Sequence, residues 1–431
     1  MANQSRSDIA HLLRRTGFGP TAAEVDAAVT KGYDAVVAEL LDFSGPDPVD
    51  STAPPAFAPY EPLGQKALTP EERQAINKRR GDDLRALQAW WLTRMADTAH
   101  PLREKLTFFW HGHFATSYEK VRRPDLMLRQ NEIFRHMGAG RFEDLTQTVA
   151  KDPAMLIWLD AASDKKAHPN ENFARELMEL FTLGIGAYTE DDVREAARAF
   201  TGWYVNPKEE AFALQPRQHD DGTKTVLGQT GPWGGEEVIH IIVANPACAP
   251  FITARLWSHL AYPIATDDPV VRALAPTLAG GDVKGLLGAI LHHDEFRSDR
   301  AKAGLVKQPV EWVLGALRAL RLPAGDPHVL GALRQLGQIP LEPPNVGGWP
   351  QNEYWLTTAS SLARLTLASA LANLADLSAI AAAAPADRPD LIAHQLSVTW
   401  SETTFRGLAQ ATTDPKELVT LALVSPEFVL A

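Results

Sequence analysis

Apolar residues recur at helical spacing through most of the chain. This period predicts helices over residues 5–15, 21–32, up to 41, 69–97, 101–110, 117–137, 144–150, 153–159, 170–183 and 190–201. From about residue 236, helical patterns alternate with short loops to the end. Thr21 and Glu24 have the spacing of a capping box, and Thr69 followed by Pro70 is a second N-terminal signature.

Two segments interrupt the helical pattern. Residues 43–70 contain seven prolines, from Pro46 to Pro70, which predicts a long surface loop or arm. Residues 203–233 combine glycine, proline and short β-type runs, which predicts a small β-hairpin or loop insertion. No repeat of fixed period and no regular β-α-β alternation occurs. We therefore expect a mostly α fold, with residues 1–431 in a single large multi-helix domain.

Charge and composition limit the classes of partner. The 431 residues carry a formal net charge of −11, which argues against general affinity for nucleic acid. No stretch of about 20 uncharged apolar residues is present, so we expect no membrane span. The sequence MANQSRSDIAHLLRRTGFG lacks the apolar core of a signal peptide. A cytoplasmic location is expected, or an exported one if an N-terminal signal has been removed.

The predicted helix 170–183 has two different faces. One is apolar and should be buried, while the other carries Asn172, Arg175, Glu176 and Glu179. Two carboxylates at this spacing could bind a hard cation together or divide acid and base roles. The alternative is an ion-pair network on an ordinary amphipathic helix.

Two histidines flank a glycine in the segment Trp110–Phe114. In extended backbone His111 and His113 would point the same way, which suits metal chelation. On a helix they would point to opposite sides, and Gly112 allows the chain to leave helical geometry. The alternative role is a helix C-cap with a core hydrogen bond.

Two further polar segments lie outside the strong helical pattern. Residues 219–224 combine imidazole, carboxylates and an ammonium group, although Asp221-Gly222 is also typical of a plain polar turn. Residues 343–350, with Trp349 and the nearby Trp355, could form a sugar-stacking platform or pack into the core. The familiar phosphate-loop, dinucleotide, nucleophile-elbow and zincin motifs are missing from the sequence.

Several of these segments together resemble one protein family. The matching stretches are HLLRRTGFGPT at 11–21, LREKLTFFWHGHFATS at 102–117, NENFARELMELFTLGIGAYTEDDVREAARAFTGW at 170–203, RQHDDGTKTVLGQTG at 217–231, PPNVGGWP at 343–350 and SPEF at 425–428. They are similar to the bacterial domain-of-unknown-function family 1800. The resemblance implies one large domain and no particular activity. Members of that family are often exported, and this sequence differs in lacking a recognisable signal.

The leading hypothesis is an enzyme with a polar His/Glu/Arg site, with or without a divalent metal ion, acting on a polar, anionic or polyhydroxylated substrate. Candidate catalytic residues are His111, His113, Glu176, Glu179, His219 and Asp220, and the first four are also the candidate metal ligands. Candidate substrate-binding residues are Asn170, Asn172, Arg175, Arg198, Trp203, Lys224, Asn345 and Trp349.

Two other classes of function stay open. A non-catalytic protein could bind a glycan or a protein partner through the loops around Trp203, Trp349 and Trp355. A redox protein with an organic cofactor is the third hypothesis, and only the tryptophans favour it. Convergence of the polar segments on one concave pocket would favour an enzyme.

Overall fold

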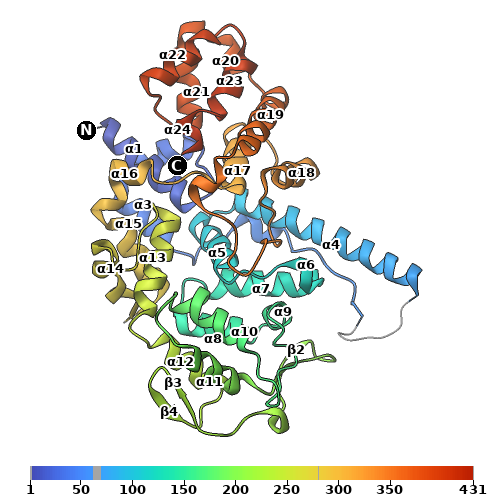
Figure 1. Ribbon diagram of the computed structural model, residues 1–431. Coiled ribbons are helices and arrows are strands. Elements are labelled where there is room, and N and C mark those ends of the chain that lie inside the picture. Colours follow the sequence, from blue (N-terminus) through green and yellow to red (C-terminus); the bar gives the residue numbers. More distant parts are fainter. Residues whose placement is uncertain (1, 62–68, 280, 431) are drawn as a thin grey trace.

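The computed structural model describes residues 2–61, 69–279 and 281–430. Within them the chain is mostly helical, with two small antiparallel sheets, as the hydrophobic pattern predicts (Figure 1). The first elements are α1 (Ala2–Thr16), α2 (Ala22–Lys31), α3 (Tyr33–Leu41), the 3-10 helix η1 (Pro48–Ser51), α4 (Pro70–Asp97), α5 (Pro101–His113), α6 (Tyr118–Val121), α7 (Pro124–Met137), α8 (Phe142–Ala150), α9 (Pro153–Trp158), α10 (Glu171–Glu176), the π-helix η2 (Leu177–Thr182) and α11 (Glu190–Phe200).

The strands lie in the predicted insertion at 203–233. They form two hairpins, with Trp203 opposite Leu214 in the first and Lys224 opposite Gly231 in the second. The elements of this region are β1 (Trp203–Asn206), β2 (Ala211–Leu214), the 3-10 helix η3 (Pro216–Gln218), β3 (Lys224–Val226) and β4 (Gln229–Gly231).

Helices continue from residue 235 to the end. They are α12 (Gly235–Val243), α13 (Cys248–Leu260), α14 (Pro269–Ala279), α15 (Val283–His292), η4 (Asp294–Arg297), α16 (Asp299–Lys302), α17 (Pro309–Ala319), α18 (Pro327–Leu336), η5 (Asn352–Trp355), α19 (Thr358–Leu374), α20 (Ser378–Ala382), η6 (Pro385–Asp387), α21 (Arg388–Leu396), α22 (Glu402–Gln410), α23 (Pro415–Leu423) and α24 (Pro426–Val429).

Local chemistry explains where several helices begin. The Thr21 hydroxyl accepts the Glu24 N–H, and the Glu24 carboxylate accepts the Thr21 N–H. Thr69 and Glu72 form the same reciprocal pair at the start of α4. Each box satisfies two backbone donors that a helix start otherwise leaves unpaired.

Three predicted helix boundaries were wrong. The predicted helix 117–137 is split into α6 and α7, because Arg122 adopts a left-handed φ of 56° just before Arg123-Pro124. Proline lacks an N–H and disfavours helical geometry in the residue before it. Helix α5 continues to His113 rather than ending at Trp110, and the final turns of the predicted helix 170–183 are a π-helix.

The apolar core forms two clusters that share helices. Trp110 and Trp257 belong to the first cluster, and Trp91 and Trp312 to the second. Helices α5, α7 and α9 contribute residues to both clusters. In Figure 1 these helices lie between the C-terminal helices at one end and the strands at the other.

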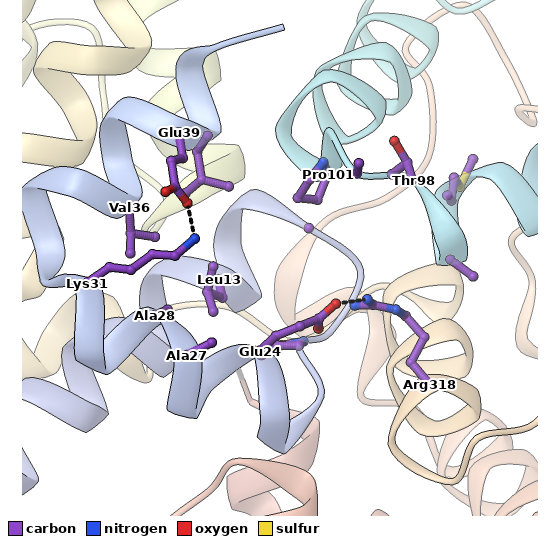
Figure 2. Close-up of a pocket in the computed structure, with 16 residues that line it drawn as sticks. Leu13, Glu24, Ala27, Ala28, Lys31, Val36, Glu39, Thr98, Pro101 and Arg318 are labelled. Carbon is purple, nitrogen blue, oxygen red and sulfur yellow. Dashed lines mark hydrogen bonds and ion pairs between the residues drawn. The ribbon is translucent and has the colours of Figure 1, made fainter. Parts of the chain in front are cut away.

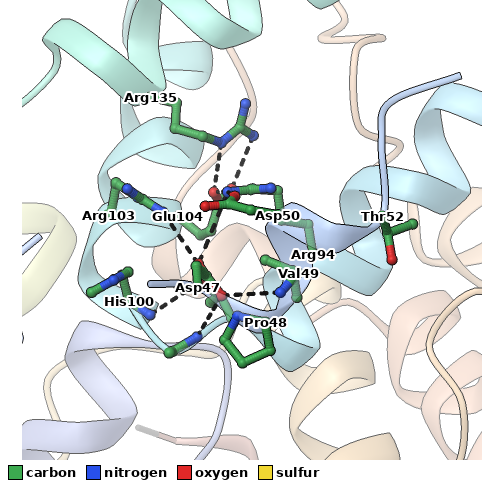
Figure 3. Close-up of polar contacts among 12 residues, drawn as sticks. Asp47, Pro48, Val49, Asp50, Thr52, Arg94, His100, Arg103, Glu104 and Arg135 are labelled. Atoms are coloured by element: carbon green, nitrogen blue, oxygen red, sulfur yellow. Dashed lines mark hydrogen bonds and ion pairs between the residues drawn. The ribbon is translucent and has the colours of Figure 1, made fainter. Parts of the chain in front are cut away.

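A buried charge network fixes the proline-rich segment to the helical body. The Glu104 carboxylate, fully buried, accepts from Arg94 Nε at 2.8 Å and from Arg135 Nε at 2.6 Å (Figure 3). Arg94 also reaches Asp50 of η1 at 2.6 Å, and Asp47 accepts the Ala99 N–H at 3.0 Å. The predicted arm is therefore anchored at 47–52; its residues 62–68 lie outside the described part of the chain.

Among the described helices, none alone is long and apolar enough to cross a bilayer; α12 and α13 together satisfy both criteria but meet at a bend of 71°.

Candidate functional site

The two histidines in the last turn of α5 contact different neighbours. His111 Nε2 accepts the Leu341 N–H at 3.0 Å, and its ring lies against Trp91 and Trp349. His113 Nε2 donates to the Phe181 carbonyl at 2.9 Å. Burial lowers the pKa of each histidine to about 3, so both are neutral at pH 7. The segment is helical, so the predicted chelating pair is not formed.

The loop 343–350 packs directly on α5 at Gly112. Gly348 has a φ of +83°, and a Cβ there would lie 2.3 Å from the Gly112 carbonyl oxygen. The Trp349 indole stacks on Phe108 with 5.8 Å between ring centroids. Two glycines thus allow two backbones to approach closely, and Trp349 is a core residue rather than an exposed stacking platform.

The π-helix η2 carries the second carboxylate of the predicted polar face. Glu179 accepts a hydrogen bond from the Tyr188 hydroxyl. Partial burial, together with the negative charge of Glu179, raises the pKa of Glu176 above its usual range. Arg175 lies near these carboxylates but forms its bidentate pair with Glu190, at 2.6 and 2.7 Å. Single π-turns recur at functional sites in proteins.

A pocket of about 340 Å³ joins three of the segments singled out from the sequence. Its walls include His113 of α5, Glu179 of η2 and Gly347 of the 343–350 loop. Gly184 shapes the wall, because it has a φ of +80° and a Cβ there would lie 2.9 Å from the Phe251 ring.

Arg255 of α13 completes this pocket, and sequence reasoning missed it. Among the described residues it forms no ion pair with a carboxylate, and its Nε is buried without a hydrogen-bond partner. Burial lowers its pKa, which indicates an uncompensated charge. One sequence signal was available: Arg255 is the only Lys, Arg, Asp or Glu in the run CAPFITARLWSHL. A charge alone in an apolar helix requires a partner or a function.

A column of rings continues from the pocket into the interior. Phe109 stacks on His113 with centroids 5.6 Å apart, and it also contacts the ring of His259, at 5.2 Å. His259 Nε2 and His113 Nδ1 are buried and have no hydrogen-bond partner in the described part of the chain. Since His113 donates through Nε2, its Nδ1 keeps a free lone pair.

The segment 219–224 forms a separate cluster with α11. Arg198 Nε lies 2.8 Å from Asp220 Oδ2 and lowers the pKa of that carboxyl to about 2. Lys224 is buried and donates to two backbone carbonyls of the same turn, while His219 Nδ1 donates to the Thr201 carbonyl at 2.8 Å. These contacts match the alternative interpretation of a satisfied polar turn.

The other predicted substrate-binding residues either support the local fold or are exposed to solvent. Asn170 is the N-cap of α10 and accepts the N–H groups of Asn172 and Phe173. Asn172 is exposed, and Asn345 accepts the Gly347 N–H at 2.9 Å. Trp203 is buried among aromatic rings.

The predicted set of four metal ligands is not assembled. Across residues 2–61, 69–279 and 281–430, no three His, Cys, Asp or Glu side chains lie close enough together to hold a metal ion. The physical reason is the helical backbone at 111–113, which turns His111 toward Trp349 and away from His113.

A second pocket, of about 280 Å³, lies where α1–α3 meet α4, α5 and α17 (Figure 2). Its rim charges are paired: Lys31 binds Glu39 at 2.7 Å, and Glu24 binds Arg318 at 2.7 Å. Its inner wall is largely apolar, with Leu13 and Val36 among the residues shown. It therefore lacks the unpaired charge that marks the pocket at Arg255.

Comparison with known proteins identifies the family. The family model described as "Protein of unknown function (DUF1800)" matches residues 11–430. No curated protein and no solved structure matches the chain significantly.

Proposed function

The chain belongs to the DUF1800 family, and we propose that it is an enzyme that binds a small anionic substrate in the pocket between α5, η2 and α13. One observation carries the proposal: the unpaired guanidinium of Arg255 shares this pocket with the Glu179 carboxylate and the neutral imidazole of His113. Arg255 is half-buried, and a partly desolvated cation without a counter-ion is costly, so a bound carboxylate or phosphate would offset that cost.

Each side chain has a role that its contacts support. The Arg255 fork would hold the substrate anion through paired hydrogen bonds. Glu179 would accept a proton from the substrate, and the Tyr188 hydroxyl that binds it would keep the carboxylate oriented. His113 Nδ1 would accept a hydrogen bond from the bound substrate. These roles describe proton-transfer chemistry on a molecule that carries a carboxylate or phosphate.

Ile185 supplies an apolar edge at the pocket. It is 87% exposed and lies between two glycines with positive φ, Gly184 and Gly186. Removing an exposed isoleucine side chain from water is favourable. A substrate with an apolar portion beside its anion would therefore gain binding free energy by covering Ile185.

Anion binding tests the proposal directly. Isothermal titration with inorganic phosphate, succinate and citrate should give saturable binding to the wild-type protein. Arg255→Gln should weaken it at least tenfold, because a charged hydrogen bond is worth about 1.5–3 kcal/mol. Arg175→Gln is the matched control, since Arg175 lies near the same carboxylates but is paired with Glu190.

Two results would overturn the proposal. One is no measurable binding of any of the three anions to wild type. The other is equal binding by Arg255→Gln and Arg175→Gln. Glycan binding through Trp203, Trp349 and Trp355 gains no support, because all three indoles are buried.

A further inference from the structure

A larger pocket, of about 580 Å³, opens at the other end of the α10–η2 helix. One wall is the loop containing Ser163 and Asp164, and the other contains Gln215 and Gln218 beside η3. Side chains of Val121 and other apolar residues of α6, α9 and β1 complete it. None of these residues lines the Arg255 pocket.

Backbone pairing holds the Asp164 loop rigidly along β1. The Asp164 N–H donates to the Trp203 carbonyl at 3.1 Å, and the Gly202 N–H donates to the Asp164 carbonyl at 3.0 Å. Ser163 bridges Tyr204 in antiparallel fashion. The Lys166 N–H donates to the Gln218 carbonyl at 2.8 Å, which links the two walls. The pocket is therefore built on paired backbone rather than on a free loop.

Asp164 lines this pocket, and one of its carboxyl oxygens has no partner in the described part of the chain. The residue is 5% exposed, and its Oδ1 accepts the Asn170 N–H at 3.1 Å. Its Oδ2 is buried and has no partner among the described residues. Burial raises the pKa of Asp164 to about 6, although two backbone N–H groups oppose that shift. A buried carboxyl with an empty oxygen and no cationic partner is costly without a ligand.

The surrounding polar groups are free as well. In the described structure, the side chains of Ser163, Tyr204, Gln215 and Gln218 make no hydrogen bond to protein. Together with Asp164 they offer hydroxyl, phenol, amide and carboxyl groups. Apolar surface from Val121 and its neighbours lies beside them. Sugars combine vicinal hydroxyls with an apolar ring face, and amides, carboxyls and tyrosines match both parts.

We infer that this pocket is a binding site for a neutral carbohydrate ring, with the Asp164 carboxyl accepting a sugar hydroxyl and the Gln215 and Gln218 amides binding the neighbouring hydroxyls. The volume is within the range of small-ligand sites and accommodates a mono- or disaccharide. The inference stands independently of the anion pocket, because it uses none of the same side chains.

Saturation-transfer NMR with glucose, galactose, mannose, N-acetylglucosamine and cellobiose tests the inference on the full chain. At least one sugar should bind wild type. Gln215→Ala and Gln218→Ala should each weaken that binding about fivefold, as expected for one hydrogen bond. Their melting temperatures should not change, because neither side chain supports the fold. Asp164→Leu should abolish binding, and Asp164→Asn, which keeps an acceptor for the Asn170 N–H, should retain part of it.

Two controls separate the outcomes. Gln410→Ala, an exposed glutamine on α22, should bind like wild type. Arg255→Gln should also leave sugar binding unchanged, so failure of the anion proposal would not affect this one. The inference is overturned if no sugar binds at about 50 mM, or if binding is unchanged in Gln218→Ala and Asp164→Leu.

Discussion

His113 donates its Nε2 proton to the carbonyl oxygen of Phe181 across 2.9 Å, and this bond joins α5 to the π-helix. Because a carbonyl can only accept, the bond sets the tautomer and leaves the Nδ1 lone pair free. Phe181 lies near the end of η2, where helix carbonyls lack partners within the helix. The histidine therefore caps the same helix that carries Glu179 to the pocket.

Replacing His113 with phenylalanine tests this bond. The Phe181 carbonyl would stay buried without a donor, so we expect His113→Phe to lower the free energy of unfolding by about 1–3 kcal/mol. Urea denaturation measures the change. His328→Phe is the control, because His328 is almost fully exposed and should change stability by about 0.5 kcal/mol or less. Equal effects of the two substitutions would show that the bond contributes nothing.

The helices and their caps were predictable because their signals are local. Apolar spacing defines α2 and α11, and Thr21 with Glu24 marks a start that needs no tertiary information. The π-turn of η2 was not predictable in this way. An α-helix and a π-helix of six residues bury nearly the same positions, and here Leu177 and Phe181 are buried as the α pattern predicts.

The pocket was predictable only in part. His113 and Glu179 were identified by residue type, and the structure brings them to one pocket. Arg255 was missed because the lack of a partner is a tertiary property that no sequence spacing reveals. For the same reason Arg198 was predicted to bind substrate and Asp220 to be catalytic, although the two side chains pair with each other.

The contact between Gly348 and Gly112 gives a second prediction. Gly348→Ala would place a Cβ 2.3 Å from the Gly112 carbonyl oxygen in a left-handed conformation, so we expect a loss of about 2–4 kcal/mol in unfolding free energy. Gly331→Ala is the matched control. It lies inside α18 with no atom within 4 Å of the added methyl, and it should stabilise the protein by up to about 1 kcal/mol.

Those two alanine substitutions also separate loop packing from overall stability. If Gly348→Ala shifts the loop off α5, the Trp349 fluorescence environment should change in the native state, while Gly331→Ala should leave it unchanged. Wild-type stability for Gly348→Ala would contradict the close approach of the two backbones.

The buried carboxylate of Glu104 gives a third prediction. Glu104→Gln leaves Arg94 and Arg135 without their shared counter-ion, and we expect a loss of about 3–5 kcal/mol, read from chemical denaturation. Asp191→Asn removes one partner of the exposed pair between Asp191 and Arg194 and should cost about 0.5 kcal/mol or less. A small effect of Glu104→Gln would mean that water replaces the lost charge.

Acid sensitivity gives the last prediction, and it rests on His111. Its pKa in the folded protein is lowered to about 3 by burial, against about 6.5 for an unfolded chain. Below pH 6.5 the unfolded state therefore binds a proton that the folded state does not bind. The free energy of unfolding falls as the pH falls toward 3. Above pH 6.5 the group contributes no pH dependence.

His111→Gln removes the titrating ring and keeps an acceptor for the Leu341 N–H. Relative to this variant, wild type should lose about 2.7 kcal/mol of unfolding free energy between pH 7.5 and 4.5. Urea titrations at both pH values measure the difference, and the comparison cancels the contributions of other groups, such as the Asp152 carboxyl, whose pKa is raised to about 7. A constant difference at the two pH values would show that folded His111 titrates in its ordinary range and is open to water.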